Sequence, residues 1–177
     1  YEFGSDDVVI VSSDKDFYQL IDDRVKVWSP GQKRLIDGDV VIEKMHVKSS
    51  NVALTRAFVG DPSDNINGVK GVGFKTLAKR FPALTFDERV SMDFIFKECE
   101  RLKKTSKVQV YSSVLENKDL VRRNFRLMCL DISTLAATQI QQIKGSLEIN
   151  EKKYDKLSLL RSLRKFGLIN FDPNALF

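Results

Sequence analysis

Hydrophobic and polar residues follow two different periods along this chain. Residues 8–13, Val-Val-Ile-Val-Ser-Ser, begin with four β-branched side chains, and such a run predicts a buried strand. A second short strand is expected at residues 25–28, Val-Lys-Val-Trp, because the turn sequence Ser-Pro-Gly follows it directly. Residues 17–21 predict one or two helical turns, and residues 34–42 predict a short hairpin or extended segment around Asp-Gly-Asp.

From residue 50 onward, apolar positions recur with the spacing of helices, about 3.6 residues. The helices expected from this spacing cover residues 50–59, 74–81, 87–104, 107–117, 134–144 and 151–166. Gly60 and Pro82 end the first two of them. The pattern therefore predicts an α/β fold, in which the end of an α/β sheet is followed by a helical extension.

Composition limits the class of protein without identifying one. The chain has 177 residues, of which 42% are hydrophobic and 30% are charged, as in ordinary globular proteins. No apolar run approaches the roughly 18 residues that span a bilayer, and no secretory signal opens the chain. Cys99 and Cys129 lack the spacing of a metal site, so we expect two reduced thiols in a cytoplasmic protein without membrane contact.

Charge is distributed unevenly along the sequence. Residues 1–64 carry 8 Lys or Arg against 12 Asp or Glu, whereas residues 65–177 carry 21 against 12. An acidic section followed by a basic one is expected where metal-binding carboxylates lie beside a surface that holds a polyanion. Lysine and arginine also solvate exposed helix faces in many proteins, so the asymmetry alone is weak support for this interpretation.

A first pair of carboxylates, Asp14 and Asp16, follows the strand expected at residues 8–13. In open α/β sheets, ligands bind beyond the carboxyl ends of the strands. Two residues that are two apart in an extended chain point to the same side, where their charges repel unless a cation lies between them. The alternative is that one of these carboxylates simply caps the helical turn that starts near Phe17.

A second pair, Asp61 and Asp64, belongs to the segment Gly-Asp-Pro-Ser-Asp-Asn. Proline after Asp61 suits the first turn of a helix, and the three-residue spacing then places both carboxylates on one face. A cap and turn without a metal is again the plainer alternative. Carboxylate oxygens at a strand end and near a basic loop suit hard divalent cations that act on phosphate.

A glycine-punctuated basic segment, residues 68–80, comes directly after the second pair. Three glycines in six residues let the backbone approach a phosphate closely, and the following helix start offers free N–H groups. The segment is not a Walker loop, and a helix C-cap followed by a turn remains open as the alternative. The residues expected to bind the DNA backbone are Gly68, Lys70, Gly71, Gly73, Lys75, Thr76, Lys79 and Arg80.

Taken in order, these motifs resemble the 5′-nuclease (flap endonuclease) superfamily, and most of all its phage type, the ribonuclease H and 5′→3′ exonuclease of T-even phages. The resemblance covers residues 8–81 specifically, while the helical remainder fits loosely. It implies a mostly parallel, PIN-like α/β sheet, a helix–three-turn–helix and a helical C-terminal extension. It also implies a localisation in the cytoplasm, or in the host cytoplasm if a phage encodes the protein.

The resemblance assigns roles to the motifs residue by residue. Asp14, Asp16, Asp61 and Asp64 match family carboxylates that help to hold two Mg²⁺ or Mn²⁺ ions, which activate water and stabilise the scissile phosphate. Gly68 to Gly73 match a loop that grips the duplex backbone and often holds K⁺. The implied substrates are duplex or branched DNA with 5′ ends or flaps, or RNA–DNA hybrids in primer removal during replication or repair. A single-stranded-DNA-binding protein or a polymerase is an expected partner.

The sequence departs from the family pattern in one respect. The family also uses acidic residues that precede the strand at residues 8–13, and Asp6 and Asp7 are poorly placed to substitute for them. Because residues 1–5 lack an initiator Met and resemble a cloning remnant, we expect a C-terminal portion of such a nuclease. The expected divisions are residues 6–60, the end of the nuclease core, and 61–177, the helix–three-turn–helix and helical region. Such a portion is expected to bind DNA, to cleave it weakly or not at all, and to be able to self-associate through an exposed strand edge.

Two other functions fit part of the pattern. In a non-catalytic DNA-binding module of the helix–hairpin–helix type, the basic segment binds DNA and the aspartates are caps. A ribonuclease of the PIN type shares the carboxylate chemistry but lacks the glycine loop.

Overall fold

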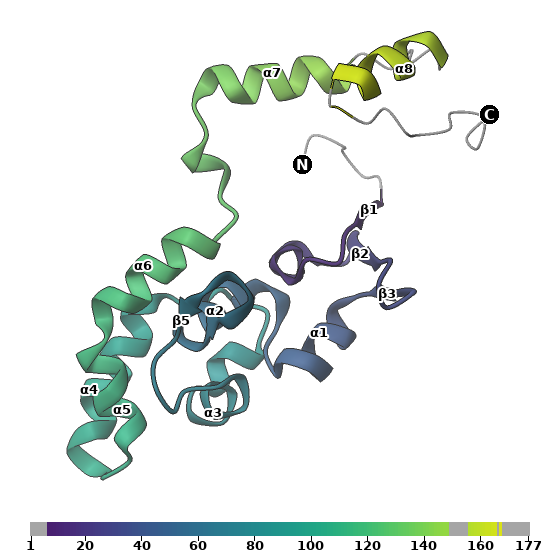
Figure 1. Ribbon diagram of the computed structural model, residues 1–177. Helices are drawn as coiled ribbons and strands as arrows, with labels where there is room; N and C mark the ends of the chain where they lie inside the picture. Colours follow the sequence, from purple (N-terminus) through teal and green to yellow (C-terminus); the bar gives the residue numbers. More distant parts are fainter. Residues whose placement is uncertain (1–6, 149–155, 166, 168–177) are drawn as a thin grey trace. The chain divides into compact units, whose positions relative to one another are not determined.

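The computed structural model describes residues 7–148, 156–165 and 167 (Figure 1). The chain divides into two compact units, Tyr1–Leu130 and Asp131–Phe177. The division expected between the nuclease core, residues 6–60, and the helical region, residues 61–177, falls inside the first unit and stays a prediction. The first unit contains the sheet, all four aspartates of interest and the glycine-rich segment.

A three-stranded sheet opens the first unit. Its strands β1 (Val8–Val11), β2 (Val25–Ser29) and β3 (Arg34–Ile36) lie in the order β1-β2-β3. β1 is parallel to β2, but β3 is antiparallel to it, so the expectation of a mostly parallel sheet holds for one of the two pairings. Because side chains alternate along a strand, Ile10, Val27 and Ile36 face the core. The opposite face exposes Val9, Val11, Trp28 and Leu35, so the strand β1 is present as expected, but the expectation that it is buried was wrong for this face.

The segment after β3 corrects one expectation. Gly38–Met45 form the helix α1 rather than part of a hairpin or extended segment. The Asp37 carboxylate accepts a hydrogen bond of 3.0 Å from the Val40 N–H, so Asp-Gly-Asp caps a helix and does not form a hairpin turn. His46, with a left-handed φ of 60°, ends the helix.

Helix α2 (Val52–Val59) lies at the centre of the first unit. It follows the short 3₁₀ turn η2 (Ser49–Asn51), and its residues from Val52 to Phe58 are all buried. It packs against α6 (Lys118–Met128), a helix that the sequence pattern did not predict, and against α3 (Phe74–Arg80). The buried Asn124 of α6 donates hydrogen bonds to the carbonyls of Ala57 and Asn67, at 3.1 and 2.8 Å. This amide joins three segments that are distant in sequence.

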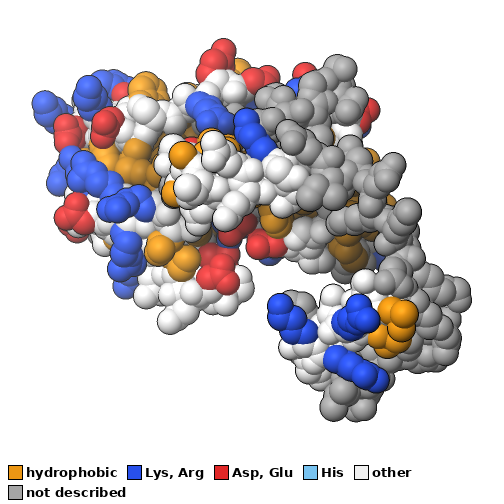
Figure 2. Space-filling view, turned by 90° about the horizontal axis from the view of Figure 1, so that it is seen from above, with side chains coloured by type: hydrophobic (Ala, Val, Ile, Leu, Met, Phe, Trp, Pro, Cys, Tyr) orange, Lys and Arg blue, Asp and Glu red, His pale blue; other side chains and the backbone are white. Residues whose placement is uncertain are grey.

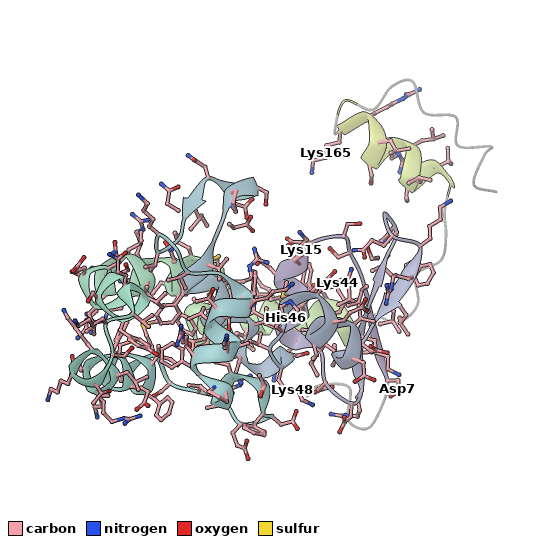
Figure 3. All side chains as sticks on the ribbon, turned by 90° about the horizontal axis from the view of Figure 1, so that it is seen from below. Asp7, Lys15, Lys44, His46, Lys48 and Lys165 are labelled. Atoms are coloured by element: carbon pink, nitrogen blue, oxygen red, sulfur yellow. The ribbon has the colours of Figure 1, made fainter. Side chains whose placement is uncertain are left out.

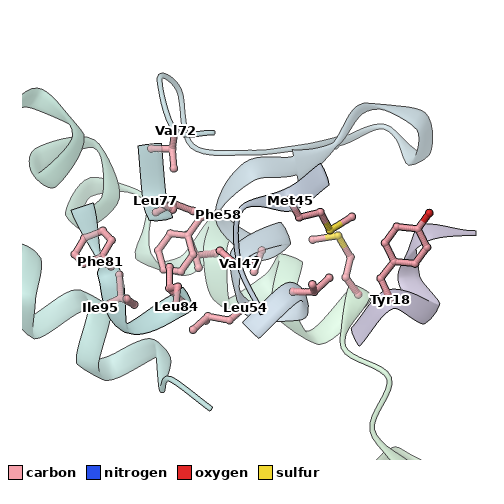
Figure 4. Close-up of a cluster of buried hydrophobic side chains, with 14 of the residues drawn as sticks. Tyr18, Met45, Val47, Leu54, Phe58, Val72, Leu77, Phe81, Leu84 and Ile95 are labelled. Carbon is pink, nitrogen blue, oxygen red and sulfur yellow. The ribbon is translucent and has the colours of Figure 1, made fainter. Parts of the chain in front are cut away.

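A hydrophobic core runs from the sheet to the helices. Side chains from η1 (Lys15–Leu20), α1, α2, α3 and η4 (Pro82–Thr85) meet there (Figure 4). Fully buried members include Tyr18, Phe58, Leu77, Phe81 and Leu84. The glycine-rich segment, residues 68–80, contributes Val69 and Val72 to this core near its start and Leu77 near its end. Both ends of the segment are therefore anchored by buried side chains.

Two further helices, α4 (Met92–Thr105) and α5 (Gln109–Glu116), pack against each other. They confirm the helices expected near residues 87–104 and 107–117. Asn51 fixes the loop that leads to α4, because its side-chain amide donates to the carbonyls of Leu84, Phe86 and Glu88.

The second unit consists of η5 (Ile132–Thr134), α7 (Ala137–Glu148) and α8 (Lys156–Lys165). Helices were expected at residues 134–144 and 151–166, and part of the second range lies outside the described residues. Within the part of the chain that the structure describes, no helix is long and apolar enough to cross a membrane.

Candidate metal centre and nucleic-acid interface

The first pair of aspartates lies where β1 ends. Asp14 caps η1, and its carboxylate accepts a hydrogen bond of 2.8 Å from the Asp16 N–H. Asp16 belongs to that 3₁₀ turn, so the two residues are not the neighbours in an extended strand that the sequence predicted. The capping alternative is therefore correct for Asp14. It does not account for the Asp16 side chain, which caps nothing and points toward α2.

The second pair surrounds a short turn. β4 (Gly60–Asp61) and β5 (Ile66–Asn67) form a small antiparallel ribbon, and η3 (Pro62–Asp64) lies between them. Asp61 caps η3, and its Oδ1 accepts hydrogen bonds from the Ser63 N–H and hydroxyl, at 3.0 and 2.5 Å. The capping role predicted for Asp61 is thus present, and it occupies one carboxylate oxygen only.

The two pairs meet around one pocket. The pocket has a volume of about 250 Å³ and is lined by Ser13, Asp14, Lys15, Arg56, Asp61, Ser63 and Asp64. Three of the four predicted metal ligands line it, although 47 residues separate the Asp14 and Asp61 positions. The structure thus brings together strand-end and turn carboxylates that the sequence placed in separate motifs.

Arg56 of α2 lies between the pairs. Its side chain is 5% exposed, its Nη1 lies 2.7 Å from Asp16 Oδ1, and its Nη2 donates to Asp61 Oδ2. The contact with Asp16 is an ion pair without a well-aligned hydrogen bond, because Arg56 Nη1 and Asp16 Oδ1 are both buried and lack a hydrogen-bond partner among the described residues. One guanidinium therefore connects a carboxylate from each pair.

The two bridged carboxylates differ in acidity. Burial raises the pKa of Asp16 above its ordinary value, and the nearby charges of Asp14, Asp61 and Asp64 add to this effect, while Arg56 opposes it. Burial also pushes the pKa of Asp61 upward, but the hydrogen bonds from Ser63 and the charges of Arg56 and Lys15 outweigh it. The pKa of Asp61 consequently lies below its ordinary value.

The donor chemistry fits a hard divalent cation, but the arrangement is not a finished ligand cage. Mg²⁺ and Mn²⁺ prefer carboxylate oxygens, and such oxygens line the pocket. Within the described ranges, no three His, Cys, Asp or Glu side chains are close enough together to hold one metal ion. Asp16 Oδ1 is paired with Arg56 but accepts no hydrogen bond among the described residues, and this unsatisfied oxygen is the observation that favours an additional cation here.

The glycines of the adjoining segment have different structural roles. A Cβ on Gly68 would lie 1.9 Å from the Val59 carbonyl oxygen, and a Cβ on Gly60, which has a φ of 79°, would lie 2.3 Å from the Gly68 nitrogen. These two glycines allow two backbone segments to touch. Gly71, with a φ of 78°, and Gly73 have open space at the Cβ position. Gly71 and Gly73 thus have open space on the Cβ side of the backbone, whereas Gly68 is close to Val59 on that side, and the phosphate-binding role expected of all three glycines stays a prediction.

The cations of this segment are open to solvent. Lys70, Lys75 and Lys79 are exposed, and no carboxylate among the described residues lies within 4.0 Å of their nitrogens. Arg80 is half-buried, and its guanidinium lies 6.0 Å from the centre of the Tyr111 ring. Thr76 is half-buried on the same helix.

Further cations lie on the helices. In Figure 2, Lys and Arg side chains gather over the end of the first unit that α4 to α6 form. Lys103, Lys104 and Lys107 line a pocket of about 360 Å³ between α4 and α5.

Sequence reasoning missed Arg56 and Lys15. Lys15 projects from η1 near Lys44 (Figure 3), and both line a second pocket of about 400 Å³ beside Arg56 and Asp61. A charged residue within the apolar run of residues 52–59 was the available signal for Arg56, since a buried arginine requires an acidic partner. Which carboxylates it would meet depends on the tertiary structure.

Comparisons with known proteins give a consistent picture. The chain is 30% identical to the thermostable DNA polymerase I of Thermus aquaticus over 174 residues, which are 96% of this chain and 19% of the polymerase. It is 39% identical to the thermostable DNA polymerase I of Thermus thermophilus over 97 residues, 55% of this chain and 11% of that one. A 5′-3′ exonuclease of Streptomyces coelicolor is 42% identical over 78 residues, 41% of this chain and 26% of the exonuclease.

Solved structures show the same fold. The flap endonuclease D15 of bacteriophage T5, crystallised in a complex with DNA and metal ions, superposes with a TM-score of 0.58 and 23% identity. The match covers 70% of this chain and 43% of the phage protein. The T5 5′-exonuclease with bound zinc superposes with a TM-score of 0.57, with the same coverage. No protein-family model matches the chain. The chain spans about a quarter or less of the length of the two DNA polymerases and the Streptomyces exonuclease that it matches.

Proposed function

Because the chain belongs to the 5′-nuclease (flap endonuclease) family, we propose that it supplies one part of a divalent-metal-dependent 5′→3′ exonuclease and flap endonuclease. In this proposal Asp14, Asp16, Asp61 and Asp64 contribute ligands for Mg²⁺ or Mn²⁺. The bound ions would activate water and stabilise the charge that develops on the scissile phosphate. The convergence of three of these carboxylates on one pocket is the observation that carries the proposal.

The exposed part of the glycine-rich segment supplies the DNA-binding function. Lys70, Lys75 and Lys79 carry positive charges that pair with no carboxylate in the described part of the chain, and Gly71 and Gly73 have open space at the Cβ position. Such a surface positions a duplex through its phosphates and does not read its bases. The substrates that we propose are duplex or branched DNA with 5′ ends or flaps, with RNA–DNA hybrids as a second class. Binding of K⁺ at residues 68–73 and partnership with a polymerase or a single-stranded-DNA-binding protein stay predictions.

Asp64→Asn is the sharpest test of the metal site. Asp64 is exposed and forms no ion pair among the described residues, so its replacement leaves the folded structure undisturbed. We expect Mn²⁺ affinity, measured by calorimetry, to fall by about tenfold or more, while the free energy of unfolding stays unchanged. Asp119→Asn, an exposed carboxylate on α6, is the matched control and leaves Mn²⁺ affinity unchanged.

The alternative function is a non-catalytic DNA-binding module, in which the aspartates are caps. The capping hydrogen bonds of Asp14 and Asp61 favour it. It predicts that Asp64→Asn leaves Mn²⁺ affinity unchanged and that neither protein cleaves a 5′-flap substrate in Mg²⁺. Equal Mn²⁺ affinity in the wild type and in Asp64→Asn would therefore reject the metal centre and favour the binding module.

A further inference from the structure

Arg56 is a buried charge on an otherwise apolar helix, and its ion pairs suggest more than neutralisation of two carboxylates. Its helix is apolar except for Thr55, whose hydroxyl is satisfied by the Asn51 carbonyl at 2.8 Å, and Arg56 itself. Burial of an arginine destabilises a protein unless acidic partners compensate for the lost hydration. Its partners are the two carboxylates, Asp16 and Asp61, that also belong to the proposed metal centre.

The bridge between these carboxylates is incomplete. Arg56 Nη2 donates to Asp61 Oδ2, but the 2.7 Å approach of Nη1 to Asp16 Oδ1 gives no aligned hydrogen bond. Among the described residues, this buried donor and this buried acceptor meet each other as an ion pair, but neither makes a hydrogen bond. Buried groups of this kind are normally hydrogen-bonded, so the contact with Asp16 is the weaker half of the bridge and is more readily exchanged for another partner.

The charges around Arg56 do not balance. Asp14, Asp16, Asp61 and Asp64 surround it, and the cations among the residues lining the pocket are Arg56 and Lys15. Lys44, which lines the neighbouring pocket together with Arg56 and Asp61, adds a third cation. With every group ionised, four negative charges then face three positive ones, and the negative charge that remains favours the binding of a cation.

A divalent cation and the guanidinium require the same oxygens. Asp61 Oδ1 is already used by Ser63, so Oδ2, which Arg56 holds, is the oxygen left for a metal ion. The pocket of about 400 Å³ beside Arg56 offers a position to which its side chain can move.

We propose that Arg56 is a displaceable internal counter-cation: it holds Asp16 and Asp61 together, and a divalent metal ion must displace its guanidinium in order to bind. This inference rests on the proposed metal centre. It adds that Arg56 and the metal ion compete for the carboxylates of Asp16 and Asp61, so the arginine lowers the affinity for the metal. Arg56 is in this view a positioning residue, which keeps two repelling carboxylates in place until the metal arrives.

Arg56→Gln tests the competition. The glutamine keeps a polar side chain but removes the charge, so Mg²⁺ affinity measured by calorimetry is expected to rise about tenfold. In EDTA the variant is expected to melt at a lower temperature than the wild type, and saturating Mg²⁺ is expected to raise its melting temperature more than that of the wild type. Lys15→Gln is the matched control, because Lys15 lines the same pocket but forms no ion pair among the described residues. Its removal is expected to raise Mg²⁺ affinity by a smaller factor.

A measurement on the wild-type protein covers the case in which Arg56→Gln fails to fold. The NMR signal of the Arg56 side-chain Nε–H, assigned with Arg56→Lys, is expected to shift and to exchange faster with water as Mg²⁺ is added. An unmoved signal at saturating Mg²⁺ would overturn the inference, as would an affinity gain in Arg56→Gln no larger than that in Lys15→Gln.

The two proposals fail in different ways. If Asp64→Asn weakens Mg²⁺ binding but Arg56→Gln does not strengthen it, the metal centre stands and the competition is rejected. If the wild type, Asp64→Asn and Arg56→Gln all bind Mg²⁺ equally weakly, the metal centre itself is rejected and the competition with it.

Discussion

The carboxylate pocket and the glycine-rich basic segment adjoin each other, yet they hold their charges in opposite ways. At the pocket, the buried Arg56 pairs with Asp61, which lines it, and with Asp16, which lies beside it, and all three side chains are largely withdrawn from solvent. In the segment, Lys70, Lys75 and Lys79 project into solvent without an acidic partner among the described residues. The difference indicates that charge contributes to folding in the first region, whereas in the second it faces solvent, where we propose that it binds nucleic acid.

Mutations should therefore affect the two regions differently. Changes in the pocket should alter stability and metal binding together. Changes to the exposed cations should alter nucleic-acid binding alone. The glycines that connect the regions should give the largest effects of all.

Gly68→Ala is expected to have the largest effect. Its Cβ would lie 1.9 Å from the Val59 carbonyl oxygen, so two backbone segments would have to separate. We expect a loss of more than about 3 kcal/mol in the free energy of unfolding, measured by urea denaturation. Gly73→Ala is the control, because its Cβ meets nothing within 4 Å and its φ is −130°. Equal stability of the two variants would show that Gly68 is not packed as described.

Asp61→Asn is expected to have the next largest effect. It leaves Arg56 buried with only the poorly aligned Asp16 as a partner, and removal of one member of a buried ion pair costs about 3 kcal/mol. The measurement is again urea denaturation, in EDTA so that metal binding does not contribute. Asp64→Asn lines the same pocket without an ion pair and should cost less than ~0.5 kcal/mol. A smaller loss in Asp61→Asn than in Asp64→Asn would contradict the bridge.

The double variant Lys75→Gln/Lys79→Gln is expected to weaken DNA binding without changing stability. Both lysines are exposed on one face of α3. If each contacts a phosphate, the slope of log K against log salt should become less steep by about 0.9 per lysine. Fluorescence anisotropy with a labelled 5′-flap duplex measures this. The control is Lys26→Gln, which lies on β2, and an equal loss of affinity there would argue against a specific interface.

The smallest expected effect is a pH dependence. The pKa of Asp61 is lowered in the folded protein, so its ionised form stabilises the fold above the unfolded pKa, and this contribution is lost as the pH falls through the folded pKa. The stability difference between the wild type and Asp61→Asn should thus be constant from pH 7 to about 5 and should shrink below about pH 4. The pKa of Asp16 is raised and acts in the opposite direction, and because the Asp61 charge contributes to that rise, Asp16 offsets part of the change between the two proteins. A difference that grows with falling pH would contradict the assignment.

The sequence predicted the individual motifs better than their connections. Local patterns were sufficient to predict the strand β1 from its β-branched run, the helix α3 from its apolar spacing and the cap at Asp61 from the proline that follows it. The helix α1 was missed because Asp37-Gly38-Asp39 is compatible with both a hairpin turn and a helix start, and only the packing of the residues that follow decides between them.

The candidate site shows a similar limit. Asp14, Asp61 and Asp64 were recognised as candidates, but their meeting at one pocket depends on how α2 and the sheet pack. Arg56 was missed for the same reason, since its partners come from two other elements. The role of Gly68 in phosphate binding stays a prediction, and its close contact with Val59 is a constraint between segments that no local pattern reveals.

The most direct test of the metal centre is the anomalous scattering of Mn²⁺ in crystals of this chain. We expect a Mn²⁺ peak within the pocket lined by Asp14, Asp61 and Asp64, with the Arg56 guanidinium moved away from Asp61. A Mn²⁺ peak only at the other acidic pocket, beside Asp22, Asp37 and Asp39, would contradict it, as would a fully occupied Arg56 bridge at saturating Mn²⁺.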